Sequence, residues 1–143
     1  MILLDTNVIS EPLKPVRNQA VLEWTNAQQI ETLYVSTINL AEMRFGIAAM
    51  ASGKRKDLLN EALEKQILPL FTGRILSFDE IASSAYAKLQ SQARSRGHSI
   101  SPTDGYIAAI ALSRGFAVAT RDTSPFEAAG LVVINPWVWE ARR

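Results

Sequence analysis

The chain has 143 residues, 48% of them hydrophobic, which suits a single domain spanning 1–143 with a core of its own. A formal net charge of +1 is too small to mark a nucleic-acid binder by itself, and the lack of cysteine excludes disulfides and thiolate metal sites. The apolar N-terminal stretch is too short for a membrane span and lacks the basic flank of a signal peptide, so we expect a cytoplasmic protein without a membrane partner.

Short apolar runs bounded by turn or cap residues predict five buried strands, at residues 2–4, 33–35, 75–78, 116–119 and 131–134. Helical spacing of apolar residues predicts helices around 21–24, 40–50, 58–68, 81–93 and 106–112. Turn residues at 53–56 and 97–99 each separate two helices. Because strands and helices alternate along the chain, the sequence predicts an α/β fold with a five-stranded parallel sheet.

Capping residues sharpen the predicted helix boundaries. Ser101, followed by a proline, is typical of an N-cap, and Ser124 repeats this pattern before a later helix. Gly115 is expected to end the helix that Ser101 begins.

Four acidic residues fall where a parallel sheet presents its ligand-binding edge. Asp5 directly follows the first strand, and Asp122 closely follows the fourth. If these two strands flank the point where strand order reverses, both carboxylates lie at that reversal. Glu42 and Asp104 lie near helix starts, and helices that return from strands begin at the same edge. We therefore expect four carboxylates to converge there.

Four bare carboxylates at close quarters would raise one another's pKa values and destabilise the fold, and a cation would relieve that repulsion. With no cysteine and one histidine, the available ligands are oxygens, which favour Mg²⁺ or Mn²⁺ over zinc or copper. An all-carboxylate site suits phosphate substrates, because the ion can neutralise charge on phosphoryl oxygens while water attacks in line.

Each acid also has a purely structural interpretation. Asp5 could be a turn residue or the cap of the next helix, and Glu42 could pair with Arg44 or Arg55. Asp104 could serve as the acid of a capping-box variant for its own helix. Asp122 is the hardest to explain in this way, since the cap signature downstream does not need it.

Four motifs carry a family resemblance: LLDTNVIS, LAEMRFGI, SPTDGYIAAIA and VATRDTSPF, followed by NPW near the end. In this order and spacing they resemble the PIN-domain family, specifically VapC-type toxins of the FitB-like group. The resemblance covers essentially the whole chain and implies a three-layer fold with a helical hairpin. It also implies a metal-dependent endoribonuclease whose acids are Asp5, Glu42, Asp104 and Asp122. Asn7 and Thr120 match the small polar positions that support such a site.

The same resemblance implies the toxin of a type II toxin–antitoxin pair, which hydrolyses RNA phosphodiesters with Mg²⁺ or Mn²⁺. Asp5, Asp104 and Asp122 would hold the ion, with Glu42 as a further ligand or as the group that orients the attacking water. The implied partners are RNA, a VapB- or FitA-like antitoxin, operator DNA through that antitoxin, and a second copy of the chain in a homodimer.

Alternatives remain open at this point. The chain could be a non-catalytic PIN-like subunit of a DNA-bound repressor complex, whereas aspartyl-phosphate chemistry and nucleotide binding lack their motifs. Arg121 and residues 54–56 are candidate phosphate contacts, although the latter could be a solvated loop. His98 is expected in a solvated turn. Trp137 could stack on bases or pack the chain end. The stripe of Met43, Ile47 and Met50 could be core or a partner groove.

Overall fold

The computed structural model describes residues 1–141 and contains one parallel five-stranded sheet, in the order β3-β2-β1-β4-β5. The strands are β1 (Ile2–Leu4), β2 (Leu33–Ser36), β3 (Ile75–Leu76), β4 (Ala117–Ala119) and β5 (Val133–Ile134). All four neighbouring pairs are parallel. The predicted fold class and all five predicted strands are therefore confirmed, although β3, β4 and β5 are shorter than predicted.

Seven α-helices surround the sheet within the described residues: α1 (Thr6–Ser10), α2 (Gln19–Ala27), α3 (Thr37–Ala48), α4 (Lys54–Glu61), α5 (Glu80–Ser95), α6 (Pro102–Arg114) and α7 (Ser124–Ala128). The helix predicted at 58–68 continues beyond α4 as a π-helical segment, Ala62–Ile67, and a 3₁₀ turn, Leu68–Phe71. Further 3₁₀ turns are Glu11–Leu13, Ile30–Thr32 and Pro136–Val138. No helix in this described part is long and apolar enough to cross a membrane.

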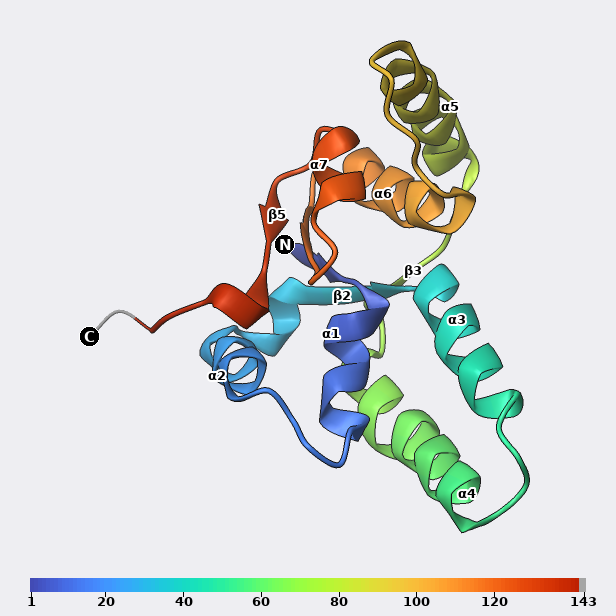
Figure 1. Cartoon of the computed structure of the whole chain (residues 1–143), viewed down its shortest axis with the longest axis vertical. Helices are drawn as coiled ribbons and strands as arrows, with labels where there is room; N and C mark the ends of the chain where they lie inside the picture. Colours follow the sequence, from blue (N-terminus) through green and yellow to red (C-terminus); the bar gives the residue numbers. More distant parts are fainter. Residues whose placement is uncertain (142–143) are drawn as a thin grey trace.

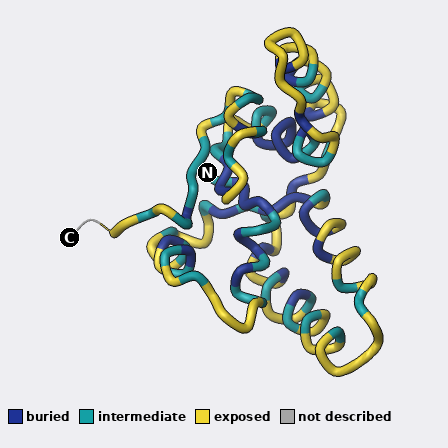
Figure 2. Tube along the Cα trace, viewed as in Figure 1, coloured by how far each residue is buried: buried dark blue, intermediate teal, exposed yellow. Residues whose placement is uncertain are grey.

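Two apolar cores lie on opposite faces of the sheet, because successive strand side chains point to opposite sides. Leu3 and Val118 belong to the core under α5, α6 and α7, whereas Leu4 and Ala119 belong to the core under α1, α2 and α3. Figure 1 shows these two groups of helices on either side of the strands, and Figure 2 shows that the strands between them are largely buried. This is the three-layer arrangement expected.

Strand order reverses between β1 and β4. The chain builds β1, β2 and β3 outward on one side and then returns to place β4 on the other side of β1. The backbone N–H of Asp5 donates to the carbonyl of Ala119 at 2.9 Å, which ties the ends of these two strands together. The condition set for the convergence of Asp5 and Asp122 is thus met, and Asp5 is at the reversal.

The helix caps are partly as predicted. The Ser101 hydroxyl accepts from the backbone N–H of Asp104 at 3.3 Å, and Gly115 ends α6 with a φ of 71°. The cap predicted at Ser124 is wrong: α7 begins at Ser124 itself, and Thr123 precedes it without a side-chain cap bond. A helical Thr123 backbone, with ψ at −32°, leaves no extended residue there from which a side chain could cap the first turn.

Candidate active site

Asp5 is the most buried of the four acids, with 7% of its surface exposed. It is the N-cap of α1, and the backbone N–H of Thr6 donates to its Oδ1 at 2.8 Å. The Thr120 hydroxyl donates to Oδ2 at 2.8 Å, and the Asn39 amide approaches Oδ1 at 3.4 Å. The capping alternative is therefore real, but Asp5 receives hydrogen bonds from three segments, α1, the residue after β4, and α3, which is more than a cap needs. They fix both carboxylate oxygens.

A second part of the network begins at the start of α3 and leads to Glu42. The buried Ser36 caps α3 in a reciprocal capping box with Asn39, and the Ser36 hydroxyl donates to Asn39 Oδ1 at 2.6 Å. Held in this way, Asn39 donates through Nδ2 to the Thr6 hydroxyl at 3.0 Å. That hydroxyl donates in turn to Glu42 Oε1 at 2.8 Å. The capping box of α3 thus orients Glu42 through Thr6.

Thr120 and Asn7 connect β4 to the same site. The fully buried Thr120 hydroxyl accepts from the Asn7 amide at 3.3 Å and from the backbone N–H of Asp122 at 3.1 Å. The side-chain amide oxygen of Asn7, Oδ1, accepts from the backbone N–H of Arg121 at 3.3 Å. With the bond to Asp5, the Thr120 hydroxyl uses its donor and both of its acceptor sites. These contacts suit the supporting positions assigned to Asn7 and Thr120, and they hold the loop that carries Asp122.

Asp104 lies in the first turn of α6, the helix that precedes β4. Since α6 must end near the amino end of β4, its first turn lies at the opposite edge, beside Asp5. Electrostatic coupling shows this proximity: the Asp104 carboxylate acts on Asp5, and Asp122 acts on Asp104. Glu42 also acts on Asp5. The structure therefore brings all four predicted acids to one edge of the sheet.

The charges of this edge are not balanced by basic side chains. Burial raises the pKa of Asp5 from 3.8 to about 6; the hydrogen bonds from Thr120 and Thr6 lower it, and Asp104 and Glu42 raise it again. Burial is also the main cause of the raised pKa of Asp104, against the lowering effect of the Ser101 hydroxyl. Ion pairs within residues 1–141 involve other carboxylates, on Glu11, Glu61 and Glu64.

The alternative pairing of Glu42 with Arg44 does not occur, because Arg44 binds Glu64 through two hydrogen bonds of 2.8 and 3.1 Å. Nor is Glu42 paired with Arg55 in the described part of the chain. Glu42 is exposed and contacts the network through Oε1 alone. Its position beside Thr6 and Asp5 is therefore not explained by a surface ion pair.

A divalent cation fits this edge by charge and donor type rather than by a ready-made cage. Among residues 1–141, no three acidic or histidine side chains are grouped so that they could hold a metal ion as they stand. The donors are nevertheless hard carboxylate oxygens, two of the acids have raised pKa values, and no basic side chain among those described offsets them. Common coordination would require the carboxylates to move from the positions that they have in this structure.

The other predicted contacts have mixed outcomes. Lys56 is occupied, since its ammonium group donates to the carbonyls of Ala48 and Met50 at 3.0 and 3.3 Å, where α3 ends. The Arg121 guanidinium lies 5.5 Å from the centre of the half-buried Trp137 ring, which packs against the core. His98 is exposed in the turn between α5 and α6, as expected. Roles in substrate binding stay predictions for Arg121 and Trp137.

Three supporting residues were missed from the sequence: Thr6, Ser36 and Asn39. A signal existed for two of them, because Ser36 followed by Asn39 three residues later has the spacing of a capping box at the end of a predicted strand. Nothing local indicates that Asn39 reaches Thr6, which lies in another segment of the chain.

Comparison with known proteins gives matches over nearly the whole chain. The family model described as the PIN domain matches residues 2–131. The plasmid stability protein StbB of Pseudomonas syringae pv. tomato is 60% identical over 137 residues, which cover 96% of this chain and 99% of that protein. The VapC ribonuclease Y4jK of Sinorhizobium fredii is 58% identical, with 96% and 98% covered. Toxin FitB of Neisseria gonorrhoeae is 52% identical, with 96% and 99% covered.

A solved structure has the same fold throughout. The structure described as FitAB bound to an IR36 DNA fragment matches with a TM-score of 0.94 at 50% identity, and the match covers 100% of both chains. The arrangement of the strands and helices that carry the four acids is therefore shared with that protein.

Proposed function

The chain belongs to the PIN-domain family, in its VapC and FitB branch, and on this premise we propose that it is the toxin of a type II toxin–antitoxin system. As such it hydrolyses RNA phosphodiesters as an endoribonuclease that depends on Mg²⁺ or Mn²⁺. The observation that supports the proposal is the placement of Asp5, Glu42, Asp104 and Asp122 at one edge of the sheet, beside the strand-order reversal, without a compensating basic side chain among residues 1–141.

Asp5, Asp104 and Asp122 would hold the ion, and Glu42 is a further ligand or orients the attacking water. When bound, the ion supplies positive charge to the phosphoryl oxygens. Side chains and backbone groups of the chain hold these carboxylates in place. Thr120 and the Thr6 backbone fix the two oxygens of Asp5, and the Thr6 hydroxyl fixes Glu42 Oε1. Oε2 of Glu42 makes no hydrogen bond within the described residues and is available to accept a proton from water.

Cleavage by the purified chain tests this function. We expect it to cut single-stranded RNA with Mn²⁺ or Mg²⁺, to stop in EDTA, and to lose at least about a hundredfold in rate in Asp5→Asn, because the most constrained ligand is lost. Asp57→Asn is the matched control, since Asp57 is an exposed aspartate in the first turn of α4. An Asp5→Asn protein that cuts RNA at the wild-type rate would refute the assignment. Sequencing of the 5′ ends made after induction would identify the RNA.

The proposed antitoxin has a suitable groove beside the acids. Leu13, Met43, Ile47 and Met50 line an apolar groove of about 340 Å³ that begins at Thr6 and Glu42. Met43 and Ile47 of α3 thus contact the core and also line this groove, whereas Met50, beyond the end of α3, lines the groove. A segment lying in the groove would reach Glu42, which suits an inhibitor. Operator DNA would be bound through that antitoxin, and the FitAB structure with a bound DNA fragment supports a DNA-binding complex.

Co-expression with the neighbouring reading frame tests the partner. We expect a complex that binds DNA, and light scattering is expected to give a homodimer of the chain alone. A non-catalytic DNA-bound subunit remains the second candidate. It would be favoured if the complex bound DNA but the free chain, loaded with Mn²⁺, cut no RNA.

A further inference from the structure

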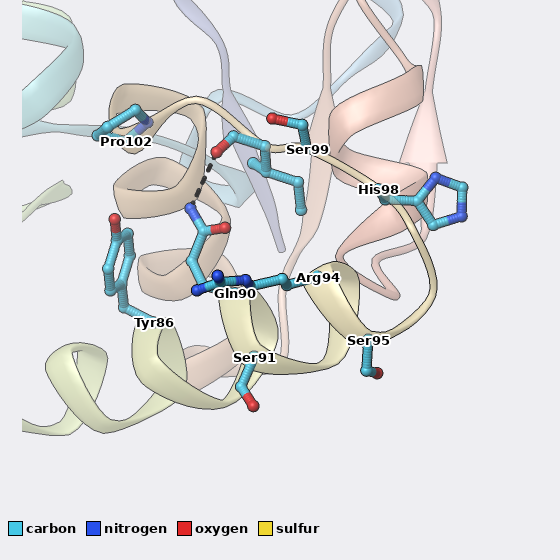
Figure 3. Close-up of a pocket in the computed structure, with 9 residues that line it drawn as sticks. Tyr86, Gln90, Ser91, Arg94, Ser95, His98, Ser99 and Pro102 are labelled. Atoms are coloured by element: carbon cyan, nitrogen blue, oxygen red, sulfur yellow. Dashed lines mark hydrogen bonds between the residues drawn. The ribbon is translucent and has the colours of Figure 1, made fainter.

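A hollow of about 750 Å³ lies between α5 and the turn that leads into α6, and we call it the α5 hollow. Tyr86 and Pro102 lie at one end, His98 at the other, and Arg94 between them, as Figure 3 shows. The helical rise separates Tyr86 from Arg94 by about 12 Å along α5. The α5 hollow is therefore elongated along the helix rather than a compact cavity.

The lining of the α5 hollow includes several polar side chains and carries no carboxylate. Arg94 supplies a guanidinium and His98 an imidazole, and Ser91, Ser95 and Ser99 supply hydroxyl groups. Residues 81–103 contain no acidic residue at all. Arg94 is exposed and makes no ion pair with any side chain among residues 1–141. An anionic ligand would therefore meet positive charge and hydroxyl donors without repulsion.

The Tyr86 end of the α5 hollow adjoins the acidic site. Pro102 is the first residue of α6, and Asp104 is in the same helical turn. The Tyr86 ring stacks on Tyr106 with centroids 4.8 Å apart, and Phe78 meets Tyr106 edge-on at 5.0 Å. A half-buried aromatic cluster thus connects the lining of the α5 hollow, through Tyr86, to the turn of α6 that carries Asp104. Aromatic faces next to a basic track are typical of proteins that bind single-stranded nucleic acid.

We propose that the α5 hollow binds a single-stranded segment of the RNA substrate next to the scissile bond. This deepens, and rests on, the ribonuclease activity proposed above. Arg94 neutralises a backbone phosphate, the serine hydroxyls donate to phosphate or ribose oxygens, and the exposed part of Tyr86 offers a face to a base. A peptide is the less suitable occupant, because the groove beside α3 has a much more strongly apolar lining than the α5 hollow.

Binding measured in the Asp5→Asn background tests this proposal without requiring cleavage. The probe is a fluorescein-labelled single-stranded oligoribonucleotide, titrated at several salt concentrations. Arg94→Ala should weaken binding roughly threefold to tenfold and lower the slope of log Kd against log salt by about 0.7, the value for one single-strand phosphate contact. Arg96→Ala is the matched control. It removes the same charge two residues away, but Arg96 does not line the α5 hollow. Arg96 lines a different hollow, on the other side of α5, together with Lys88 and Gln92.

The outcomes separate this proposal from the proposed function. If Arg94→Ala and Arg96→Ala weaken binding equally, or if Arg94→Ala leaves the salt slope unchanged, the α5 hollow is not an RNA site. If the wild-type chain cuts RNA and Arg94→Ala cuts it with the same kcat/KM, the hollow is again excluded while the nuclease stands. If the wild-type chain cuts nothing, the proposed function fails, and the binding titration still decides on the α5 hollow. Circular dichroism of both variants checks that they are folded.

Discussion

At the scale of single residues, the site is a set of charges held in place against their mutual repulsion. Asp5 is nearly buried, it receives three side-chain or backbone donors, and two other acids act on it. The hydrogen bonds stabilise its charged form, but burial outweighs them, so its pKa is raised to about 6. A residue kept in such a setting weakens the fold at neutral pH unless a cation is bound.

The first prediction concerns pH. Because the pKa of Asp5 is about 6 in the folded chain and 3.8 in the unfolded one, the folded state binds more protons between these values. Stability without divalent ions should therefore fall as pH rises from about 4 to about 6 and stay lower above that. The Asp5→Asn variant lacks this loss. The difference between its free energy of unfolding and that of the wild-type chain should therefore shift in favour of the variant by up to about 3 kcal/mol over this pH range.

Urea unfolding in EDTA at about pH 4 and about pH 7.5 measures this difference. Asp104 has a raised pKa as well, but it is present in both proteins and largely cancels. Asp57→Asn, on the exposed surface of α4, should show no such growth. If the variant and the wild-type chain differ in free energy of unfolding by the same amount at both pH values, Asp5 is not a buried carboxylate with a raised pKa.

The placement of the four acids at one edge of the sheet could be predicted, because each stands close to a strand end or a helix start. Asp5 and Asp122 follow strands, and the other two follow helix starts. The residues that orient them could not be predicted as a network. Asn39 approaches Thr6 only because β1 and β2 are adjacent, and no local pattern records which side chains meet across two strands. The Ser36 capping box predicts a helix start but not the partner of Asn39.

At the scale of elements, the contact between α5 and α6 places Asp104. Gly105, the next residue, is buried where these helices touch. A Cβ added there would lie 2.6 Å from Gln90 Nε2 and 2.8 Å from Tyr86 Cε2. The Gln90 amide donates to the carbonyl of Ile100 at 3.1 Å, so moving it away would cost a hydrogen bond as well. Gly105 is thus required by the close approach of two helices.

The second prediction follows from this contact. Gly105→Ala should destabilise the fold by about 1–2 kcal/mol, because overpacking outweighs the roughly 1 kcal/mol that alanine gains in a helix. Gly46→Ala in α3 is the matched control: nothing lies within 4 Å of the added Cβ, so this change should stabilise by up to about 1 kcal/mol. Thermal unfolding of both variants measures the two effects. If both variants were stabilised, or both destabilised, the packing argument would be contradicted.

Element prediction succeeded for long periodic segments and failed for short ones. The helix α1 was missed because Thr6–Ser10 is too short to show a helical period, and its start depends on Asp5 as N-cap. The strands β3 and β5 were overestimated because apolar residues flank them: Phe78 follows β3, and Leu131 and Val132 precede β5. At Ser124 the cap pattern was present, yet the preceding Thr123 is already in a helical conformation.

At the scale of the whole molecule, strand order converts distant sequence positions into one site. The reversal between β1 and β4 brings Asp5 and Asp122 to the same edge, while α3 and α6 bring Glu42 and Asp104 to it from the two faces of the sheet. Parallel strands and alternating helices could be predicted from the sequence. The order could be assumed only as a condition, because apolar strands do not encode their neighbours.

The third prediction tests the molecule as a metal-binding unit. Mn²⁺ should raise the midpoint of thermal unfolding of the wild-type chain, by an amount equivalent to about 2.7 kcal/mol at a hundredfold excess over the dissociation constant. The double variant Asp5→Asn, Asp104→Asn should gain nothing, while Asp57→Asn should gain as much as wild type. The readout requires no RNA and no turnover.

The same measurement at lower pH separates binding at these acids from weak adsorption elsewhere. Because the pKa of Asp5 is raised to about 6, protons compete with Mn²⁺ there at a pH where ordinary surface carboxylates are still ionised. The stabilisation should therefore shrink between about pH 7.5 and about pH 5. Stabilisation that persists undiminished at the lower pH, or that survives in the double variant, would place the ion away from Asp5 and remove the electrostatic basis for a nuclease site at the strand-order reversal.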